Sequence, residues 1–270
     1  MHHNSAVSTS IWDNTDLLWL TILLILAIAC GRSGTLMAAE SEKNIKVIFS
    51  GSTPPYVFRD GSGIVVDLVR EALIPHGITI TPVYLPIGRG SDLFARGKVD
   101  ATSIIKKSSG LQGHYSDYFM QYHNFAITLK GKAPIDSVTA LQQGDVVGFQ
   151  NAHIYLGEAF GKAVSGNPNY REMADQERQV LMLLRGRIHV AVMDEAIFKY
   201  YRLKLIDEGE VSRKVEATFN NLFTPSQYRT AFIDAAIRDK FDLGMQQLRD
   251  SGRYETIYDR YTTKYFAIRH

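Results

Sequence analysis

Residues 92–105, DLFARGKVDATSII, carry a pattern that returns later in the chain in residues 181–193, LMLLRGRIHVAVM. In both stretches a helical pattern ends at Arg-Gly, a basic and an aliphatic residue follow, and an apolar strand comes next. Gly97 and Gly186 suit the left-handed position that ends many helices. We interpret the repeat as two α/β units built alike, although Gly followed by a basic residue is also a common helix terminator.

Short β-branched runs alternate with amphipathic helical patterns around these stretches. Residues 45–49 and 79–85 predict strands, and residues 67–73 between them predict a helix. Two extended segments, residues 122–129 and 217–224, are candidates for crossings from one unit to the other. We therefore expect an α/β fold of two lobes, each a mixed sheet flanked by helices, with a two-strand hinge that allows closure around a ligand.

Two crossings make one lobe discontinuous in sequence. We predict that the first lobe comprises residues 44–125 and 223–270, and that the second lobe comprises residues 126–222. A composition of 45% hydrophobic and 21% charged residues is ordinary for a globular protein with a buried core. The formal net charge is +2 and the basic residues are scattered, which argues against a nucleic-acid partner.

Signatures of metal and cofactor sites are missing from the sequence. The single cysteine excludes an internal disulfide and a cysteine-based metal site, and the histidines lack metal-ligand spacing. Dinucleotide loops, phosphate loops and the Gly-x-Ser-x-Gly elbow are also missing. We expect a monomer with no metal, no cofactor and no catalytic residues.

The N-terminal part of the chain predicts export. Residues 17–29, LLWLTILLILAIA, form an uncharged apolar run that is shorter than the roughly 20 residues of a bilayer span. The run resembles the core of a secretory signal, but no Lys or Arg precedes it, so an uncleaved anchor stays open. Residues 1–43 are predicted to be a signal peptide or membrane anchor plus linker. Cys30 ends the run in a context similar to a lipobox and is a candidate for lipid attachment.

Several motifs follow one another in a recognisable order. They are PPYVF at residues 54–58, GIVVDL at 63–68, GKVDA at 97–101, YSDY at 115–118, VGFQ at 147–150 and an Asp-Glu pair at 194–195. Together they resemble family 3 of the bacterial extracellular solute-binding proteins over roughly residues 45–265. The resemblance implies a periplasmic-binding-protein type II fold. It also implies a periplasmic protein that captures a small polar solute, an amino acid or related organic ion, for an ABC permease without chemistry.

The resemblance implies roles for two residues. Tyr56, after the first strand, would stack on the ligand, and Asp194 would receive the ligand's ammonium group. Asp194 also follows the predicted strand 190–193, and open α/β sheets place ligands at the carboxyl ends of their strands. The alternatives are that Asp194 caps the next helix and that Tyr56 covers the edge of the core.

The sequence departs from the family where its amino-acid binders carry an Arg that grips the ligand carboxylate. No Arg occurs in residues 101–114, and Ile104 and Ile105 replace the usual small hydroxyl residues. Lys106 and Lys107 are candidates for the positive charge, although a lysine lacks the planar fork of arginine.

Two further residues complete the ligand-binding candidates. Arg89 lies in a loop that the family places near the cleft. His153 stands at a predicted helix start, where backbone amides favour an anionic group. Two other functions stay open: a periplasmic ligand-sensing module that signals through a membrane sensor, and a dehydratase-like enzyme with Asp194 or Glu195 as general acid.

Overall fold

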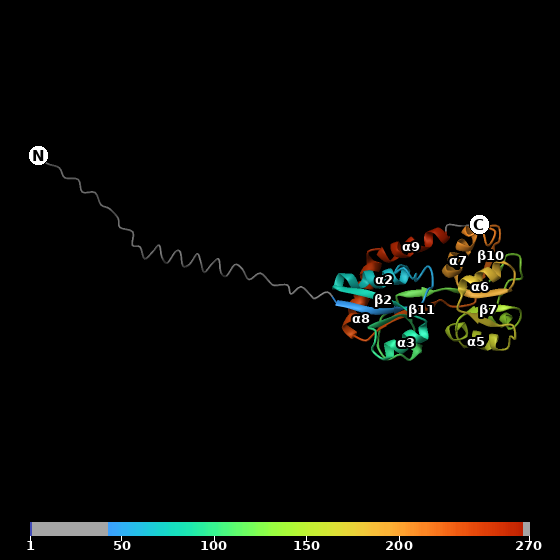
Figure 1. Cartoon of the computed structure of the whole chain (residues 1–270), viewed down its shortest axis with the longest axis horizontal. Coiled ribbons are helices and arrows are strands. Elements are labelled where there is room, and N and C mark those ends of the chain that lie inside the picture. The colour runs from blue at the N-terminus through green and yellow to red at the C-terminus, as the bar shows by residue number, and fades with distance from the viewer. Residues whose placement is uncertain (2–42, 267–270) are drawn as a thin grey trace. The chain divides into compact units, whose positions relative to one another are not determined.

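The computed structural model describes Met1 and residues 43–266, and within the latter range the chain forms two sheets, each flanked by helices (Figure 1). The first sheet has the order β2-β1-β3-β11-β4, and β5 pairs with the other end of β11. Its strands are β1 (Lys43–Phe49), β2 (Ile78–Tyr84), β3 (Ala101–Ile105), β4 (His114–Tyr115), β5 (Met120–Tyr122) and β11 (Ser226–Phe232). β1 runs parallel to β2 and β3, whereas β11 is antiparallel to β3, so the sheet is mixed.

The second sheet has the order β10-β6-β9-β7-β8. Its strands are β6 (Asn124–Leu129), β7 (Val146–Phe149), β8 (Arg171–Met173), β9 (Val190–Asp194) and β10 (Ala217–Asn220). β7 is parallel to β8 and β9, and β6 is antiparallel to β9. The expected α/β architecture with two mixed sheets is thus confirmed. The domain boundaries drawn from the sequence remain a prediction.

Helices cover both sheets. The first lobe carries α2 (Ile64–Leu73), α3 (Ile87–Ala95), α8 (Ala235–Asp250), α9 (Arg253–Phe266) and the short 3-10 helices η1 (Ile74–His76) and η2 (Lys107–Ser109). The second lobe carries α4 (Ala152–Tyr155), α5 (Glu158–Ser165), α6 (Gln176–Leu184), α7 (Glu195–Asp207) and the 3-10 helix η3 (Val138–Gln142). The repeat in the sequence is visible here, since α3 and α6 end just before Gly97 and Gly186, whose φ angles are 64° and 68°.

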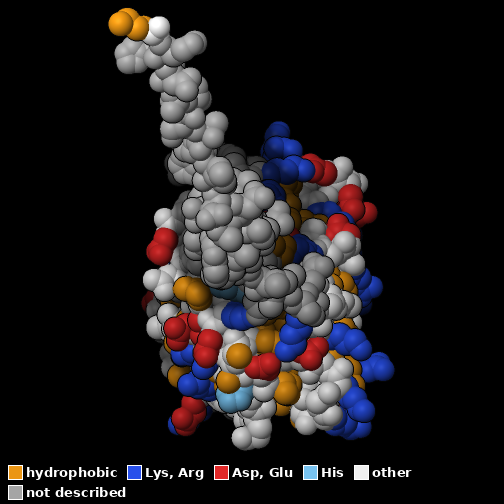
Figure 2. All heavy atoms as spheres, turned by 90° about the vertical axis from the view of Figure 1, so that its left-hand side faces the viewer, with side chains coloured by type: hydrophobic (Ala, Val, Ile, Leu, Met, Phe, Trp, Pro, Cys, Tyr) orange, Lys and Arg blue, Asp and Glu red, His pale blue; other side chains and the backbone are white. Residues whose placement is uncertain are grey.

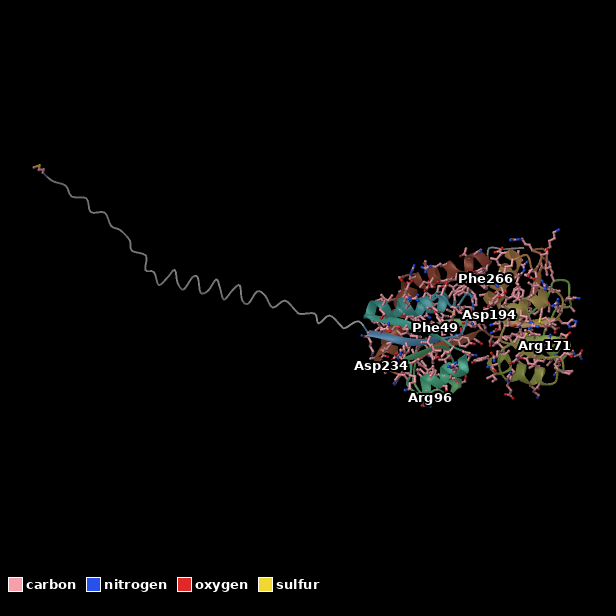
Figure 3. All side chains as sticks on the ribbon, viewed as in Figure 1. Phe49, Arg96, Arg171, Asp194, Asp234 and Phe266 are labelled. Atoms are coloured by element: carbon pink, nitrogen blue, oxygen red, sulfur yellow. The ribbon has the colours of Figure 1, made fainter. Side chains whose placement is uncertain are left out.

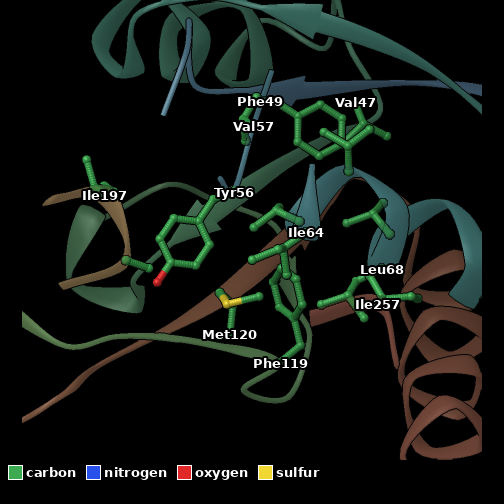
Figure 4. Close-up of a cluster of buried hydrophobic side chains, with 14 of the residues drawn as sticks. Val47, Phe49, Tyr56, Val57, Ile64, Leu68, Phe119, Met120, Ile197 and Ile257 are labelled. Atoms are coloured by element: carbon green, nitrogen blue, oxygen red, sulfur yellow. The ribbon is translucent and has the colours of Figure 1, made fainter. Parts of the chain in front are cut away.

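The core of the first lobe forms between β1 and the helices on one face of the sheet. Figure 4 shows Val47 and Phe49 of β1 beside Ile64 and Leu68 of α2, with Ile257 of α9 completing the cluster. All five side chains are fully buried. β-branched residues on the strand and apolar residues on one face of the helix therefore meet as the sequence pattern predicts.

α8 packs unusually close to α2. A Cβ atom added at Gly244 of α8 would lie 1.9 Å from the carbonyl oxygen of Ala72. Because a real Cβ cannot come so near a backbone oxygen, glycine is required for this helix contact.

α9 belongs to the first lobe but also reaches the second (Figure 1). On its own lobe, the Tyr261 hydroxyl donates to Asp67 of α2 at 2.5 Å. Toward the second lobe, the ring of Tyr265 meets that of Tyr200 of α7 edge-on with centroids 5.2 Å apart. The ammonium of Lys199 lies 3.9 Å from the centroid of the Phe266 ring. The last helix therefore ties the lobes together on one side of the hinge.

The surface charges are mixed. Both Lys and Arg side chains and Asp and Glu side chains are visible around the grey atoms on the face shown in Figure 2, and the formal net charge is +2. Between residues 43 and 266, none of the helices combines the length and the hydropathy needed to cross a bilayer. The apolar run 17–29 and Cys30 lie outside the described residues.

Candidate ligand-binding cleft

A cavity of about 510 Å³ lies between the lobes. A pocket of this size suits a small organic molecule. The first lobe contributes loop residues after β1, the end of β3 and two tyrosines of the hinge region. The second lobe contributes the carboxyl ends of β7 and β9 and the starts of α6 and α7. Side chains that line it include Thr53, Arg59, Ile104, Tyr122 and Tyr228 from the first lobe and Asn124, Phe149, Tyr155, Asp175, Glu177, Asp194, Ile197 and Tyr201 from the second.

Asp194 occupies the centre of the interlobe region (Figure 3). Its Oδ1 caps α7 by accepting hydrogen bonds from the amides of Ala196 at 2.9 Å and Ile197 at 3.1 Å, and it accepts another from the Tyr56 hydroxyl at 3.1 Å. Oδ2 accepts from the amide of His123 at 2.9 Å. Burial raises the pKa of Asp194 to about 6, against the opposing effect of these four hydrogen bonds. Asp194 therefore caps α7 and also lines the cleft. The two alternatives drawn from the sequence, a helix cap and a cleft residue, are thus compatible.

Tyr56 is brought to Asp194 but lies behind the cleft wall. Only 1% of the residue is exposed, and its ring stacks on that of Tyr122 with centroids 4.1 Å apart and an interplanar angle of 21°. The ring that lines the cleft is that of Tyr122, so stacking of Tyr56 on a ligand remains a prediction that the observed packing does not favour. Tyr56 and Asp194 do share a second cavity, of about 560 Å³, beside α9.

Tyr122 is a site residue that the sequence reasoning missed. It stands at the start of the extended segment 122–129, for which the sequence predicts only a crossing between the lobes. The signal was a tyrosine at the point where the chain leaves one sheet for the other, because such a residue faces the space between the lobes.

Lys106 bridges the two lobes at the edge of the cleft. Its ammonium donates to the carbonyl oxygen of Tyr155 and to the hydroxyl of Ser226, both at 3.2 Å, and lies 5.2 Å from the centroid of the Tyr228 ring. Desolvation lowers the pKa of Lys106. Lys106 and the exposed Lys107 line a neighbouring cavity of about 490 Å³ and not the cleft itself.

The helix start at His153 already holds an anion that the chain itself supplies. The carboxylate of Glu172 accepts hydrogen bonds from the amides of Asn151 at 2.7 Å and His153 at 3.0 Å and from the Tyr170 hydroxyl at 2.7 Å. It also lies 2.7 Å from Nδ1 of His153. Partial burial alone would raise the pKa of Glu172, but these hydrogen bonds together lower it. His153 therefore faces an internal carboxylate and does not line the cleft.

Of the arginines near the cleft, Arg59 and not Arg89 lines it. Arg89 is exposed on α3 and does not reach the cavity. Arg59 follows the PPYVF motif directly, and its Nε donates to the carbonyl oxygen of Gly51 at 3.3 Å. The position of Arg59 next to the quoted motif was the signal that could have found it.

Ile104 enters the cleft through an irregularity at the end of β3. The pairing of β3 with β11 shifts register between Arg229 and Ala231, and Ile104 opposite this shift has a φ angle of 58°. A β-branched residue with positive φ is strained, and such strain is held only by the surrounding structure. The apolar side chain thus lines the cavity near the place where the family carries small hydroxyl residues.

The second lobe brings three carboxylates to the cleft, and the protein itself partners each of them. Glu177 accepts a hydrogen bond from Lys204 at 2.5 Å, and Asp175 caps α6 by accepting one from the amide of Arg178 at 3.0 Å. Asp194 is the third. Among residues 43–266, no cluster of His, Cys, Asp and Glu could hold a metal ion.

Comparisons with known proteins bear on the fold. No protein family and no curated protein matches the sequence. An ancestral arginine-binding protein bound to glutamine is 17% identical, with a TM-score of 0.63 over 81% of this chain and 97% of that one. A histidine kinase sensor domain with similarity to periplasmic binding proteins is 20% identical, with a TM-score of 0.65 over 82% of this chain and 96% of that one.

A third similar structure is the ancestral amino-acid-binding protein AncCDT-1, described as a precursor of cyclohexadienyl dehydratase. It is 18% identical, with a TM-score of 0.62 over 81% of this chain and 95% of that one. At this level of identity the likeness concerns the fold, and it confirms the resemblance drawn from the motifs in that respect. The chain has the two-lobed fold of the periplasmic binding proteins.

Proposed function

We propose that this protein captures a small organic solute, an amino acid or a related ion, in the cleft between its lobes and performs no chemistry on it. The observation that carries the proposal is the cleft itself, a cavity of about 510 Å³ lined from both lobes and backed by the hydrogen bond between Tyr56 and Asp194. A ligand held in such a place contacts both lobes only when they are closed, so binding and closure are coupled.

Asp194 is the proposed partner of the ligand's ammonium group. Its Oδ2 accepts one hydrogen bond from the protein, from the amide of His123, and a carboxylate oxygen has room for a second donor. The other wall offers aromatic rings, among them that of Tyr122, which stacks on Tyr56, and the hydroxyl of Tyr56 donates to Asp194.

Titration calorimetry of the purified protein with the twenty standard L-amino acids tests the proposal. We expect at least one to bind, and Asp194→Asn to weaken that binding by about 10- to 100-fold, the range for hydrogen bonds to charged groups. The melting temperature should rise with ligand, since a ligand at 100 times its Kd stabilises the folded state by about 2.7 kcal/mol. The proposal would be contradicted if none of the twenty amino acids bound. It would also be contradicted if NMR showed that the protein consumes a bound amino acid.

Transport and sensing are two uses of the same binding event. For transport, we propose that the protein delivers its ligand to an ABC permease. For sensing, the similarity to a histidine kinase sensor domain favours signalling through a separate membrane protein. Deletion of the gene distinguishes them: loss of uptake of the bound amino acid supports transport, whereas normal uptake with altered gene expression supports sensing.

The proposed location is the periplasm, with the N-terminal segment either cleaved or retained as a tether. Mass measurement of protein released by osmotic shock gives the mature N-terminus. Labelling with a fatty acid, with Cys30→Ser as the control, tests lipid attachment. Recovery of the whole chain in the cytoplasmic fraction would contradict export.

A further inference from the structure

Arg59 stands out among the residues that line the cleft because it is the positively charged one. Its Nε is held by the carbonyl oxygen of Gly51 at 3.3 Å, and no carboxylate in residues 43–266 pairs with its guanidinium. The two terminal nitrogens of an arginine present parallel N–H donors that match a carboxylate. The hydrogen bond to the backbone of Gly51 positions the Arg59 side chain at the cavity. Because no internal carboxylate neutralises this cation, it is suited to bind an anionic group of the ligand.

The end of β3 offers no competing place for that anion. Ile104 presents an apolar side chain there, and Lys106 is directed away to Tyr155 and Ser226. The helix start at His153 is filled by Glu172. The ligand's carboxylate is therefore expected at the loop after β1 and not at the strand end.

Part of the cavity wall is suited to an apolar body, beside polar residues such as Thr53, Asn124 and Gln150. The apolar part of the lining consists of Ile104, Ile197 and the rings of Tyr122, Phe149, Tyr155, Tyr201 and Tyr228. With the ligand's ammonium at Asp194, a second cationic group would meet the two other carboxylates of the cleft, which are already engaged: Glu177 pairs with Lys204, and Asp175 accepts from the amide of Arg178.

We infer that the cleft takes a carboxylate with an apolar body, of the class of the aromatic amino acids, and that Arg59 holds the carboxylate while Ile104 and the tyrosine rings enclose the body. This inference rests on the proposed binding function and narrows its ligand. It makes Arg59 a specificity-determining residue.

The test is titration calorimetry of the full chain with five probes: L-phenylalanine, 3-phenylpropionate, 2-phenylethylamine, L-glutamine and L-arginine. We expect L-phenylalanine to bind at least about tenfold more tightly than L-glutamine or L-arginine, a difference of about 1.4 kcal/mol. Arg59→Ala should weaken L-phenylalanine and 3-phenylpropionate by about 10- to 100-fold. It should leave 2-phenylethylamine, which has no carboxylate, within about twofold of the native value.

Two further variants make the result specific. Arg59→Lys keeps the charge and should restore part of the affinity for the carboxylate probes. Arg171→Ala removes an exposed arginine of β8 that lies apart from Asp194 in Figure 3, and should change nothing. Because Arg59 is exposed, all these variants are expected to fold, and circular dichroism checks this.

The outcomes separate this inference from the proposed function. If L-glutamine or L-arginine binds more tightly than L-phenylalanine, or if Arg59→Ala leaves L-phenylalanine affinity within twofold, the inference is wrong while amino-acid binding stands. If none of the standard amino acids binds, both are wrong.

Discussion

The buried carboxyl of Asp194 makes a specific contribution to the pH dependence of stability. Its pKa is raised from 3.8 to about 6 in the folded protein, so the folded state binds this proton more tightly than the unfolded state does. The contribution of Asp194 is therefore most favourable below pH 3.8, and it is lost as the pH rises through about 6. The difference between the ordinary pKa of 3.8 and the folded value of about 6 corresponds to about 3 kcal/mol of unfolding free energy, since one pKa unit is about 1.36 kcal/mol.

Asp194→Asn removes this titration and keeps an oxygen that can cap α7. We expect the unfolding free energy of the native protein, minus that of the variant, to fall by up to about 3 kcal/mol between pH 4 and pH 8. Urea denaturation followed by circular dichroism at several pH values measures both quantities, and subtraction cancels the other titrating groups.

Asp234→Asn supplies a control of opposite sign. Asp234 caps α8 at the surface, and the hydrogen bond from the amide of Ala236, followed by that from Lys43, lowers its pKa. Its contribution is present above the ordinary pKa of 3.8 and is lost as the pH falls below it, so the difference for this variant should stay nearly constant above pH 4 and fall when the series is extended to lower pH. A difference for Asp194→Asn that stays constant within about 0.5 kcal/mol from pH 4 to pH 8 would refute the assignment of a raised pKa to a buried carboxyl.

Three further changes test the packing between and within the lobes. Tyr56→Phe removes a hydrogen bond to a buried carboxylate and should lower the unfolding free energy by about 1.5–3 kcal/mol, measured by urea denaturation; an unchanged value would mean that Asp194 does not depend on that donor. Lys106→Ala removes a bridge between the lobes and should increase the radius of gyration of the ligand-free protein in X-ray scattering, whereas the exposed Lys107→Ala should not; equal radii would contradict the bridge. Gly244→Ala forces a Cβ against the backbone of α2 and should lower the melting temperature, and a neutral result would show that α8 can shift.

Local features of the sequence were sufficient for much of the fold. Gly97 and Gly186 end their helices in the left-handed conformation that the repeated Arg-Gly pattern predicts, and each helix leads into a strand of a different sheet. The family resemblance indicated Asp194, and its position directly after a buried strand correctly placed it at the carboxyl end of that strand, where it lines the cleft. These predictions depend on residues close together in the chain.

The parts that sequence reasoning missed depend on long-range packing. Whether Tyr56 or Tyr122 reaches the cleft is decided by how two rings stack, and neighbouring residues do not reveal this. The partner of the His153 helix start, Glu172, comes from the adjacent strand β8. The direction of Ile104 follows from a register shift against β11, far along the chain.

The contacts of α9 with the second lobe restrict how the molecule can open. Tyr265 rests against Tyr200, and Phe266 lies under the ammonium of Lys199, so this side of the hinge is fastened by contacts that do not involve the cleft. A movement that keeps these contacts leaves the last turn of α9 against the second lobe, so the lobes can separate only on the sides that α9 does not join.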